Sequence, residues 1–315
     1  MMLENMDLTE YPHISVLIAT RNRPQSLRRC LDSVIQQKYP HFEVVVLDDA
    51  SDSSDVQKVV EEFKMWGVKY YRSEQSLGVA GSRNFLMHIA KGNILCIIDD
   101  DAYFTNDQAL VYIAEVFRRR PEVGIVATKV VDYKKQYPQL LIPFPKAVLR
   151  RKPWLANTPG YVGYYVGTCH AIRREVIDRC GGYEELLIYG EEELDLSYRA
   201  VQAGFRIWYD PRIVVHHYPQ ASVVSRSKHI KHAELYHHVK NRFVLAWKYL
   251  PYRFMILYLL IWLLRLGFVA IRTSALLEYF SGICSGLRML TKLQRKPISQ
   301  ETVSYLRKHY GRLFY

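Results

Sequence analysis

Short apolar runs alternate with segments of helical spacing along the first half of the chain. Apolar runs of strand length lie at 14–19, 42–47, 68–73, 94–98 and 123–131, and helical spacing is found between them at 26–37, 56–64, 78–90 and 107–119. This alternation predicts an α/β fold with a mostly parallel central sheet and helices on both faces. A chain of 315 residues, 49% of them hydrophobic, is long enough to bury such a core.

Polar loops follow three of these runs, at residues 21–24, 48–52 and 99–101. In open α/β sheets, ligands bind outside the carboxyl ends of the strands. We therefore expect the three loops to converge on one rim of the sheet and to form a binding site there.

Three consecutive acids, Asp99, Asp100 and Asp101, end the apolar run at 94–98. Residues i and i+2 of an extended segment point to the same side, so Asp99 and Asp101 can share a ligand, with Asp100 facing away or hydrogen-bonded to backbone. Carboxylate oxygens suit Mg²⁺ or Mn²⁺. The alternative is that these acids are solvated and cap the following helix.

The second half of the chain is less regular. Residues 164–177 predict a strand leading to a helix, residues 190–204 a helix, and residues 205–219 two strands joined by a turn at Asp210–Pro211. Acids in the first turn of the 190–204 helix have two interpretations: they stabilise a helix N-terminus, or one of them acts as a general base.

Other side chains in this half also have two interpretations each. Asp195 and Arg199 have the i,i+4 spacing of an ion pair, and Asp195 is also a second-rank site candidate. His216 and His217 end an apolar strand, so their side chains point to opposite faces and at most one should enter the site, as a metal ligand or as a structural histidine. Four aromatic residues could stack on sugars or pack in the core: Trp154, Tyr161, Tyr164 and Tyr165.

The positive charge is concentrated at the C-terminal end. Residues 220–315 hold 16 Lys and Arg against 3 Asp and Glu, within a chain whose net charge is +12. We therefore expect two parts, a near-neutral folded domain at 1–225 and a basic, apolar helical extension at 226–315. The basic residues are interleaved with a strongly apolar helix, which favours lipid over nucleic acid as the partner.

The extension contains eleven apolar residues at 254–264, followed by Arg265. A spanning helix needs about 20 apolar residues, so we expect a helix that lies on an anionic membrane surface. A buried helical subdomain, a homodimer interface and a spanning helix are the alternatives. The first fifteen residues are acidic and do not predict a signal peptide, and the five scattered cysteines include no CxxC pair. A cytoplasmic location, peripheral on the inner face of the cell membrane, is expected.

Four segments together resemble the inverting, family 2-type glycosyltransferases of the GT-A fold, of the type that builds bacterial cell-surface polysaccharides. They are "ISVLIATRNRPQSLRRCLDSVIQQKYPHFEVVVLDDASDSS", "GVAGSRNFLMHIAKG", "NILCIIDDDA" and "GGYEELLIYGEEELDLSYRAVQAGFRIWYDPRIVVHH", and the resemblance covers about residues 13–220. It implies transfer of a sugar from a nucleotide-diphosphate donor to a hydroxyl of a glycan or lipid-linked acceptor.

The resemblance also implies roles for individual residues. The donor would be bound by Thr20, Arg21, Asn22, Arg23, Asp48, Asp49, Arg83, Asn84, Asp99 and Asp100, with Gly167 and Thr168 near its sugar. Mg²⁺ or Mn²⁺ would be held by Asp101, Asp99 and His217. Glu193 would be the general base, with Glu192 as the alternative, because this chain has Glu where the family usually has Asp.

Two other functions remain as alternatives. A nucleotidyltransferase on a similar sheet should show a Gly-rich phosphate loop after the first strand, where this chain has "TRNRP". A non-catalytic nucleotide-binding or membrane scaffold would not need the acidic rim. The sequence therefore favours a metal-dependent glycosyltransferase.

Overall fold

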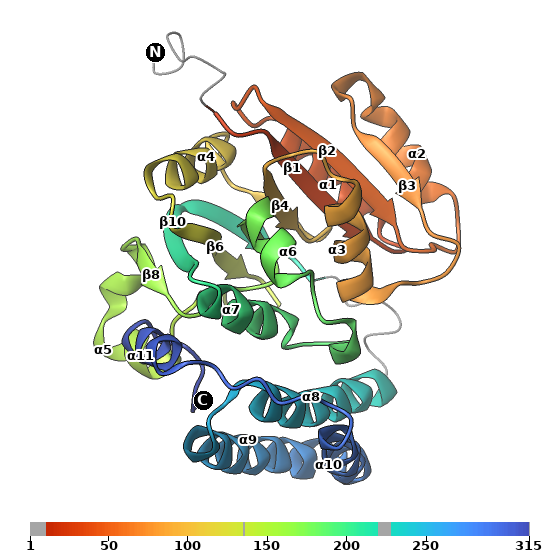
Figure 1. Cartoon of the computed structure of the whole chain (residues 1–315). Coiled ribbons are helices and arrows are strands. Elements are labelled where there is room, and N and C mark those ends of the chain that lie inside the picture. Colours follow the sequence, from red (N-terminus) through yellow and green to blue (C-terminus); the bar gives the residue numbers. More distant parts are fainter. Residues whose placement is uncertain (1–10, 135, 220–227, 315) are drawn as a thin grey trace.

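The computed structural model describes residues 11–134, 136–219 and 228–314. The first fifteen residues, in which no signal peptide is expected, lie only in part within these ranges. The expected domain boundary after residue 225 lies outside them. Figure 1 shows a central sheet covered by helices, with a further helical layer below it.

The central sheet has ten strands in the order β3-β2-β1-β4-β9-β6-β10-β5, with β7 paired to β6 and β8 to β10. The strands are β1 (Ile14–Thr20), β2 (Phe42–Asp48), β3 (Lys69–Arg72), β4 (Ile94–Ile98), β5 (Ala102–Phe104), β6 (Val123–Asp132), β7 (Gln139–Leu141), β8 (Gly160–Val162), β9 (Cys169–Arg173) and β10 (Arg206–His217). The helices are α1 (Pro24–Ile35), α2 (Asp55–Glu62), α3 (Gly78–Ile89), α4 (Ala109–Arg119), α5 (Lys146–Arg151), α6 (Arg174–Cys180), α7 (Glu192–Gln202), α8 (Lys228–Tyr249), α9 (Tyr252–Thr273), α10 (Leu276–Leu290) and α11 (Gln300–Lys308).

The expected α/β class is confirmed, but the strand directions are more mixed than the sequence indicates. Strands β3, β2, β1 and β4 are parallel, and so are β6 and β10. Strand β9 lies between β4 and β6 and is antiparallel to both. The direction of a strand depends on its connections, because a parallel neighbour needs a crossover connection. The apolar pattern of one short strand does not reveal that direction.

The expected turn at Asp210–Pro211 is wrong. Strand β10 runs through these residues, and its register against β6 shifts between Asp210 and Val214. The Asp210 carboxylate accepts hydrogen bonds from the backbone N–H of Arg212 at 3.0 Å and from its guanidinium. A bulge explains why proline is tolerated inside a strand.

Two apolar clusters cover the two faces of the sheet. In β1, Leu17 belongs to one cluster, while Val16 and Ile18 belong to the other. The first cluster extends from the sheet through α7 into the C-terminal helices, with Leu245 of α8 and Tyr258 of α9 both fully buried. The C-terminal helices therefore share a core with the face of the sheet that carries α7.

Helix α9 forms an outer layer of the molecule together with α10 (Figure 1). It has 22 residues and is long and apolar enough to cross a membrane by length and composition alone, and only 17% of its most apolar window is buried. Large exposed apolar side chains lie on α9 and α10, namely Ile256, Leu257, Leu260, Leu264, Phe268, Ile271, Leu276, Leu277, Phe280 and Leu287.

Candidate active site

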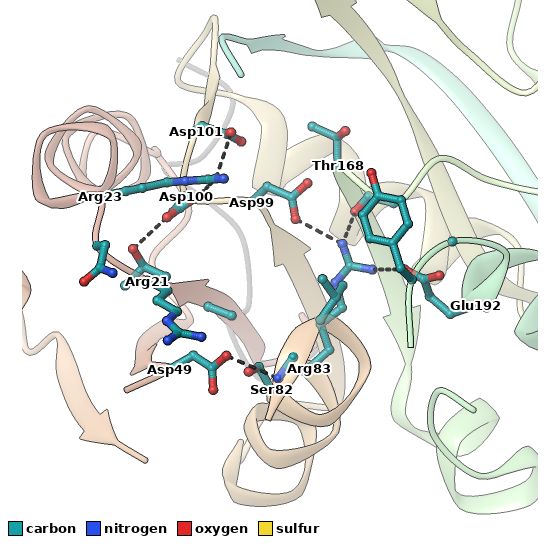
Figure 2. A pocket seen from close by; sticks show the side chains of 18 of the residues that line it. Arg21, Arg23, Asp49, Ser82, Arg83, Asp99, Asp100, Asp101, Thr168 and Glu192 are labelled. Atoms are coloured by element: carbon teal, nitrogen blue, oxygen red, sulfur yellow. Dashed lines mark hydrogen bonds and ion pairs between the residues drawn. The ribbon is translucent and has the colours of Figure 1, made fainter. Parts of the chain in front are cut away.

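The three polar loops meet, as expected, around one cavity of about 780 Å³ beyond the carboxyl ends of β1, β2 and β4. Its lining residues come from these loops, from α3, from the Gly167–Thr168 turn, from α7 and from α8. They are Ala19, Thr20, Arg21, Asn22, Arg23, Asp49, Asp52, Gly78, Val79, Ser82, Arg83, Asp99, Asp100, Asp101, Gly167, Thr168, Tyr189, Gly190, Glu192, Glu193, His217 and His238. Figure 2 shows acids and arginines facing each other across this space.

Arg23 is the first of two arginines whose positive charge offsets the negative charge of the three acids after β4. Its Nη1 lies 3.0 Å from Asp100 Oδ1 and 3.0 Å from Asp101 Oδ2 (Figure 2). Thr20 Oγ1 donates a 2.6 Å hydrogen bond to Asp100 Oδ2. The expectation that Asp100 faces away or bonds to backbone is therefore wrong, because its partners are side chains of the first loop. Burial raises the pKa of Asp100 to about 7, despite the charge of Arg23.

Asp99, Asp101 and His217 form a group whose candidate ligand atoms all lie within 4.8 Å of one another. His217 Nε2 is 3.2 Å from Asp101 Oδ1. Two carboxylates and an imidazole suit Mn²⁺ or Mg²⁺ in their donor chemistry. These residues therefore fit a divalent cation. They come from two distant segments of the chain, the acids after β4 and the end of β10, as expected.

Asp132 contacts the ring nitrogen of His217 that faces away from Asp101. The sequence did not predict this contact. Asp132 Oδ1 lies 2.8 Å from His217 Nδ1, which directs Nε2 toward Asp101. Burial by itself would lower the pKa of His217, but Asp101 and the neighbouring acids raise it above its usual value. A carboxylate behind a histidine is the usual way that proteins orient a metal-binding imidazole. His216 lies beside the Tyr103 and Tyr133 rings instead.

Arg83 lies at the centre of the site. This buried guanidinium places Nη2 3.0 Å from Asp99 Oδ1 and Nη1 3.1 Å from Glu193 Oε1. Nη2 also donates to the carbonyl of Gly167 at 3.1 Å. One side chain of α3 thus joins the acids after β4 to the acids that begin α7, as Figure 2 shows for Asp99 and Glu192 on either side of it.

Glu192 and Glu193 occupy different environments although they are neighbours. The side chain of Glu192 is 8% exposed, and that of Glu193 is 19% exposed. Burial, reinforced by the charge of Glu193, raises the pKa of Glu192 to about 8. Both carboxylates approach Arg83 Nη1, Glu193 at 3.1 Å and Glu192 at 3.7 Å, and the raised pKa of Glu192 favours its protonated form near neutral pH.

Two residues expected to bind the donor, Asp48 and Asn84, lie outside this cavity. Asp48 is fully buried and holds Tyr70 and Arg72, and it does not line the described cavity. Asn84 also lies outside the lining; its amide donates to the Tyr183 carbonyl at 2.9 Å and accepts from the Tyr183 N–H at 2.7 Å. Asp49 does line the cavity, and it accepts the N–H of Leu77 at 2.6 Å.

The expected Asp195–Arg199 ion pair is present, with Arg199 Nε 2.8 Å from Asp195 Oδ2. Asp195 is fully buried and also accepts from Tyr249 of α8, so it anchors the C-terminal helices and does not line the cavity. None of the four candidate stacking aromatics lines the cavity: Tyr164 and Tyr165 are buried in the core, while Trp154 and Tyr161 lie elsewhere on the described surface.

Helix α8 contributes to the cavity, which no motif in the sequence indicated. His238 lines it together with Tyr189 and Gly190, and its Nδ1 is 3.5 Å from Glu191 Oε1. The only relevant signal was the cluster of histidines near this position, which specifies no contact. The C-terminal extension is therefore a wall of the site.

Comparison with known proteins decides the family. The sequence model described as glycosyl transferase family 2 matches residues 15–181, more than half of the chain. The chain belongs to glycosyl transferase family 2. The match includes Arg83 and the acids after β4, and it ends before the family 2 chain reaches α7.

Curated relatives of this family 2 chain are distant, and the match covers only part of each of them. A beta-monoglucosyldiacylglycerol synthase of Trichormus variabilis is 23% identical over 196 residues, which are 60% of this chain and 41% of the relative. The putative colanic acid biosynthesis glycosyl transferase WcaA of Escherichia coli is 28% identical over 144 residues, 45% of this chain and 52% of that protein. The chain thus spans about two fifths to a half of the length of these relatives.

Solved structures share the fold. S. aureus TarS 1–349 superimposes with a TM-score of 0.53 at 20% identity, over 74% of this chain and 65% of that one. GalNAc-T7, whose structure holds UDP, GalNAc and Mn²⁺, gives 0.57 at 21% identity, over 76% of this chain and 48% of that one. The family 2 chain has the expected GT-A fold.

Proposed function

We propose that this chain is an inverting, metal-dependent glycosyltransferase that moves one sugar from a nucleotide-diphosphate donor to a hydroxyl of a glycan or lipid-linked acceptor. The observation that carries this proposal is the Arg83 bridge. It joins Asp99, among the acids suited to a donor diphosphate and its cation, to Glu193, a carboxylate suited to deprotonate an acceptor. Donor and acceptor groups would then meet in one cavity.

Glu193 is the proposed general base. A base must face the cavity and be able to accept a proton from the attacking hydroxyl. Glu193 lines the cavity and is more exposed than Glu192. The raised pKa of Glu192 favours its protonated form near neutral pH, in which it cannot accept a proton. Arg83 holds the Glu193 carboxylate from the donor side.

Asp99, Asp101 and His217 are the proposed metal ligands. A bound Mn²⁺ or Mg²⁺ would supply positive charge to the diphosphate that leaves with the nucleotide. Arg21 and Asn22 line the exposed part of the cavity near Asp49, which suits them to the nucleotide end of the donor. Asp48 and Asn84 are left out of this proposal because their polar atoms serve the fold.

A membrane-bound acceptor is supported by the outer helices and by relatives. Exposed apolar residues on α9 are accompanied by Arg253, Arg265 and Arg272, a combination suited to an anionic lipid surface. One relative, 28% identical over 29% of this chain and covering 36% of its own length, is an Escherichia coli glucosyltransferase named for a diphosphoundecaprenol-linked acceptor. We propose that residues 226–315 hold the catalytic part, residues 1–225, at the cytoplasmic face of the membrane.

A screen of nucleotide sugars tests the enzymatic proposal. Purified protein is incubated with UDP-, GDP- and TDP-sugars and Mn²⁺ or Mg²⁺, and release of the nucleoside diphosphate is measured with and without EDTA. We expect metal-dependent release from a small subset of donors, and the Glu193→Gln variant should bind the same donor without turnover. If no nucleotide sugar stabilises or reacts with the wild-type protein, the proposal is rejected.

A further inference from the structure

The turn that precedes α7 has an unusual backbone. Ile188, Gly190 and Glu191 have positive φ angles of 53°, 77° and 77°, within four successive positions. Residues other than glycine rarely adopt this region, and such conformations persist only where the surrounding structure fixes them. Glu191 is also the N-cap of α7, directly before Glu192 and Glu193. Whatever fixes this turn therefore fixes the direction of the proposed base.

The side chain of Asn241 in α8 forms hydrogen bonds to the backbone of this turn. Its side-chain amide is fully buried, and Nδ2 faces the carbonyls of Leu187, Tyr189 and Gly190 at 2.7, 3.0 and 2.9 Å. Lys240, one residue earlier, donates to the Leu186 carbonyl at 3.1 Å. Two neighbouring side chains of one helix thus bind four of the five carbonyl groups at positions 186–190, all but that of Ile188, and hold the turn against α8.

Arg242 completes the connection. Its Nη2 pairs with the Glu191 carboxylate, and both side chains are about 5% exposed or less. Its Nη1 donates a 2.6 Å hydrogen bond to the Tyr258 hydroxyl of α9, and its guanidinium lies 3.6 Å from the centre of the Trp262 ring. A single guanidinium therefore joins the N-cap residue of α7 to the apolar helix α9.

The charge at this position needs a partner. Burial by itself would raise the pKa of Glu191, but Arg242, with smaller contributions from His238 and Arg312, lowers it to about 2. Removing one member of a buried ion pair leaves the other charged and desolvated, which is strongly unfavourable. Without Arg242 the turn would have to rearrange so that Glu191 reaches water or another cation.

We propose that Arg242 is a positioning residue for the transfer reaction: it holds the Glu191–Glu193 turn in its catalytic geometry and connects that turn to α9. This inference rests on the proposed function, in which Glu193 is the base. It assigns to the C-terminal extension a role in the chemical step in addition to the proposed membrane contact. Arg242 does not line the described cavity, so it acts through Glu191 and not on the substrate.

The chain offers a matched control in Arg295. This arginine also packs on aromatic rings of the C-terminal helices, 5.2 Å from Trp247 and 4.1 Å from Tyr252. Its guanidinium donates to the carbonyls of Trp247 at 2.8 Å, in the last turn of α8, and of Leu250 at 2.6 Å, directly after that helix. Arg295 therefore contributes to the same helical layer, and among the described residues its hydrogen bonds and ring contacts do not include the turn before α7.

The test compares Arg242→Met and Arg295→Met with the wild-type full-length chain. Two readouts are used: steady-state kinetics with the best donor and acceptor, and backbone hydrogen exchange of peptides covering residues 186–193. For Arg242→Met we expect kcat to fall on the order of 100-fold, as displaced catalytic groups typically cause. Its donor KM should change little, and exchange at 186–193 should become faster. Arg295→Met should resemble the wild type in both readouts.

Milder variants keep the test decisive if Arg242→Met does not fold. Arg242→Lys keeps the charge but loses the planar fork, and Tyr258→Phe removes only the hydroxyl on α9. Both should lie between wild type and Arg242→Met, with Arg242→Lys losing more of kcat than of donor affinity. Wild-type kcat and exchange in Arg242→Lys would overturn the inference, and so would equal effects of the Arg242 and Arg295 variants.

The two proposals can fail separately. If the wild-type protein turns over no nucleotide sugar, the proposed function fails, whereas the exchange comparison still shows whether Arg242 holds the turn. If the wild-type protein is active and the Arg242 variants show normal exchange and normal kcat, only the positioning role is rejected.

Discussion

Arg83 Nη1 lies 3.1 Å from Glu193 Oε1, although 110 positions separate these residues in the chain. The same guanidinium contacts Asp99, so a proposed metal ligand and the proposed base share one buried cation. The positive charge of Arg83 offsets the repulsion between these neighbouring carboxylates. This arrangement also means that the geometry of the base depends on groups from α3, from the Gly167 turn and from α8.

Replacing the two glutamates should separate their roles. Glu193→Gln should lower kcat by about 10²- to 10⁴-fold, the usual contribution of a general base, and leave donor affinity nearly unchanged. Glu192→Gln should have a much smaller effect, because glutamine resembles the neutral form that Glu192 adopts below its pKa of about 8. Steady-state kinetics near pH 7 will measure both. A larger loss in Glu192→Gln would exchange the two assignments.

Stability should depend on pH through Glu192. Burial raises its pKa in the folded chain to about 8, from an ordinary value of 4.5. Between these values the folded state binds more protons than the unfolded state, so the free energy of unfolding should fall as pH rises through that window. Thermal melts from pH 5 to 8 should show a shallower decline for Glu192→Gln than for wild type. Exposed Glu74→Gln is the control, and identical slopes in all three proteins would contradict this expectation.

Gly167 leaves the room that Glu193 occupies. A Cβ at position 167 would collide with Glu193 Oε1 and lie 2.8 Å from Glu193 Cδ. The end of a long side chain can move away at little cost, so Gly167→Ala should fold normally but displace the carboxylate. We expect kcat to fall by about 100-fold with little change in melting temperature. Gly160→Ala, where a Cβ meets nothing within 4 Å, should keep full activity.

Asp132 should control metal affinity without touching the metal. Asp132→Asn weakens the orientation of His217, and loss of such a supporting carboxylate typically costs about 10- to 100-fold in metal affinity. Titration calorimetry with Mn²⁺ in the presence of UDP will measure the effect. Asp101→Asn should weaken binding further, and Asp107→Asn, whose carboxylate pairs with Lys38 outside this group, should not weaken it. Equal affinity in the Asp101 and wild-type proteins would exclude this metal site.

The outer face of α9 should bind anionic lipid. Leu264 is 67% exposed, and Leu264→Glu should lower the partition onto phosphatidylglycerol-containing vesicles at least about tenfold, because burial of one leucine is worth about 1.5–3 kcal/mol. Vesicle pelleting will measure this. Met65→Glu, at a 93% exposed position on the catalytic part, is the control. If wild-type protein does not pellet and elutes as a dimer that Leu264→Glu dissociates, the face is a homodimer interface instead.

Local patterns were enough to predict the α/β class and much of the rim of the site. Apolar runs that end in Thr20–Arg23, Asp49 and Asp99–Asp101 indicate strand ends, and strand ends in such a sheet meet at one edge. The i,i+4 spacing of Asp195 and Arg199 likewise predicted an ion pair that is present. The residue types did not reveal the contacts within the fold: Asp48 and Asn84, expected to bind the donor, lie outside the described cavity and contact Arg72 and Tyr183.

The sequence by itself determined the order of strands and helices, the acids at the strand ends and the amphipathic, basic character of the C-terminal helices, because each of these depends on neighbours along the chain. The tertiary structure decided the reversed direction of β9, the support of His217 by Asp132 and the closure of the cavity by α8. It also decided that Arg83 pairs with Glu193 and that Arg242 pairs with Glu191. These contacts join segments tens to more than a hundred positions apart, and their energies depend on burial and distance, which exist only once the chain has folded.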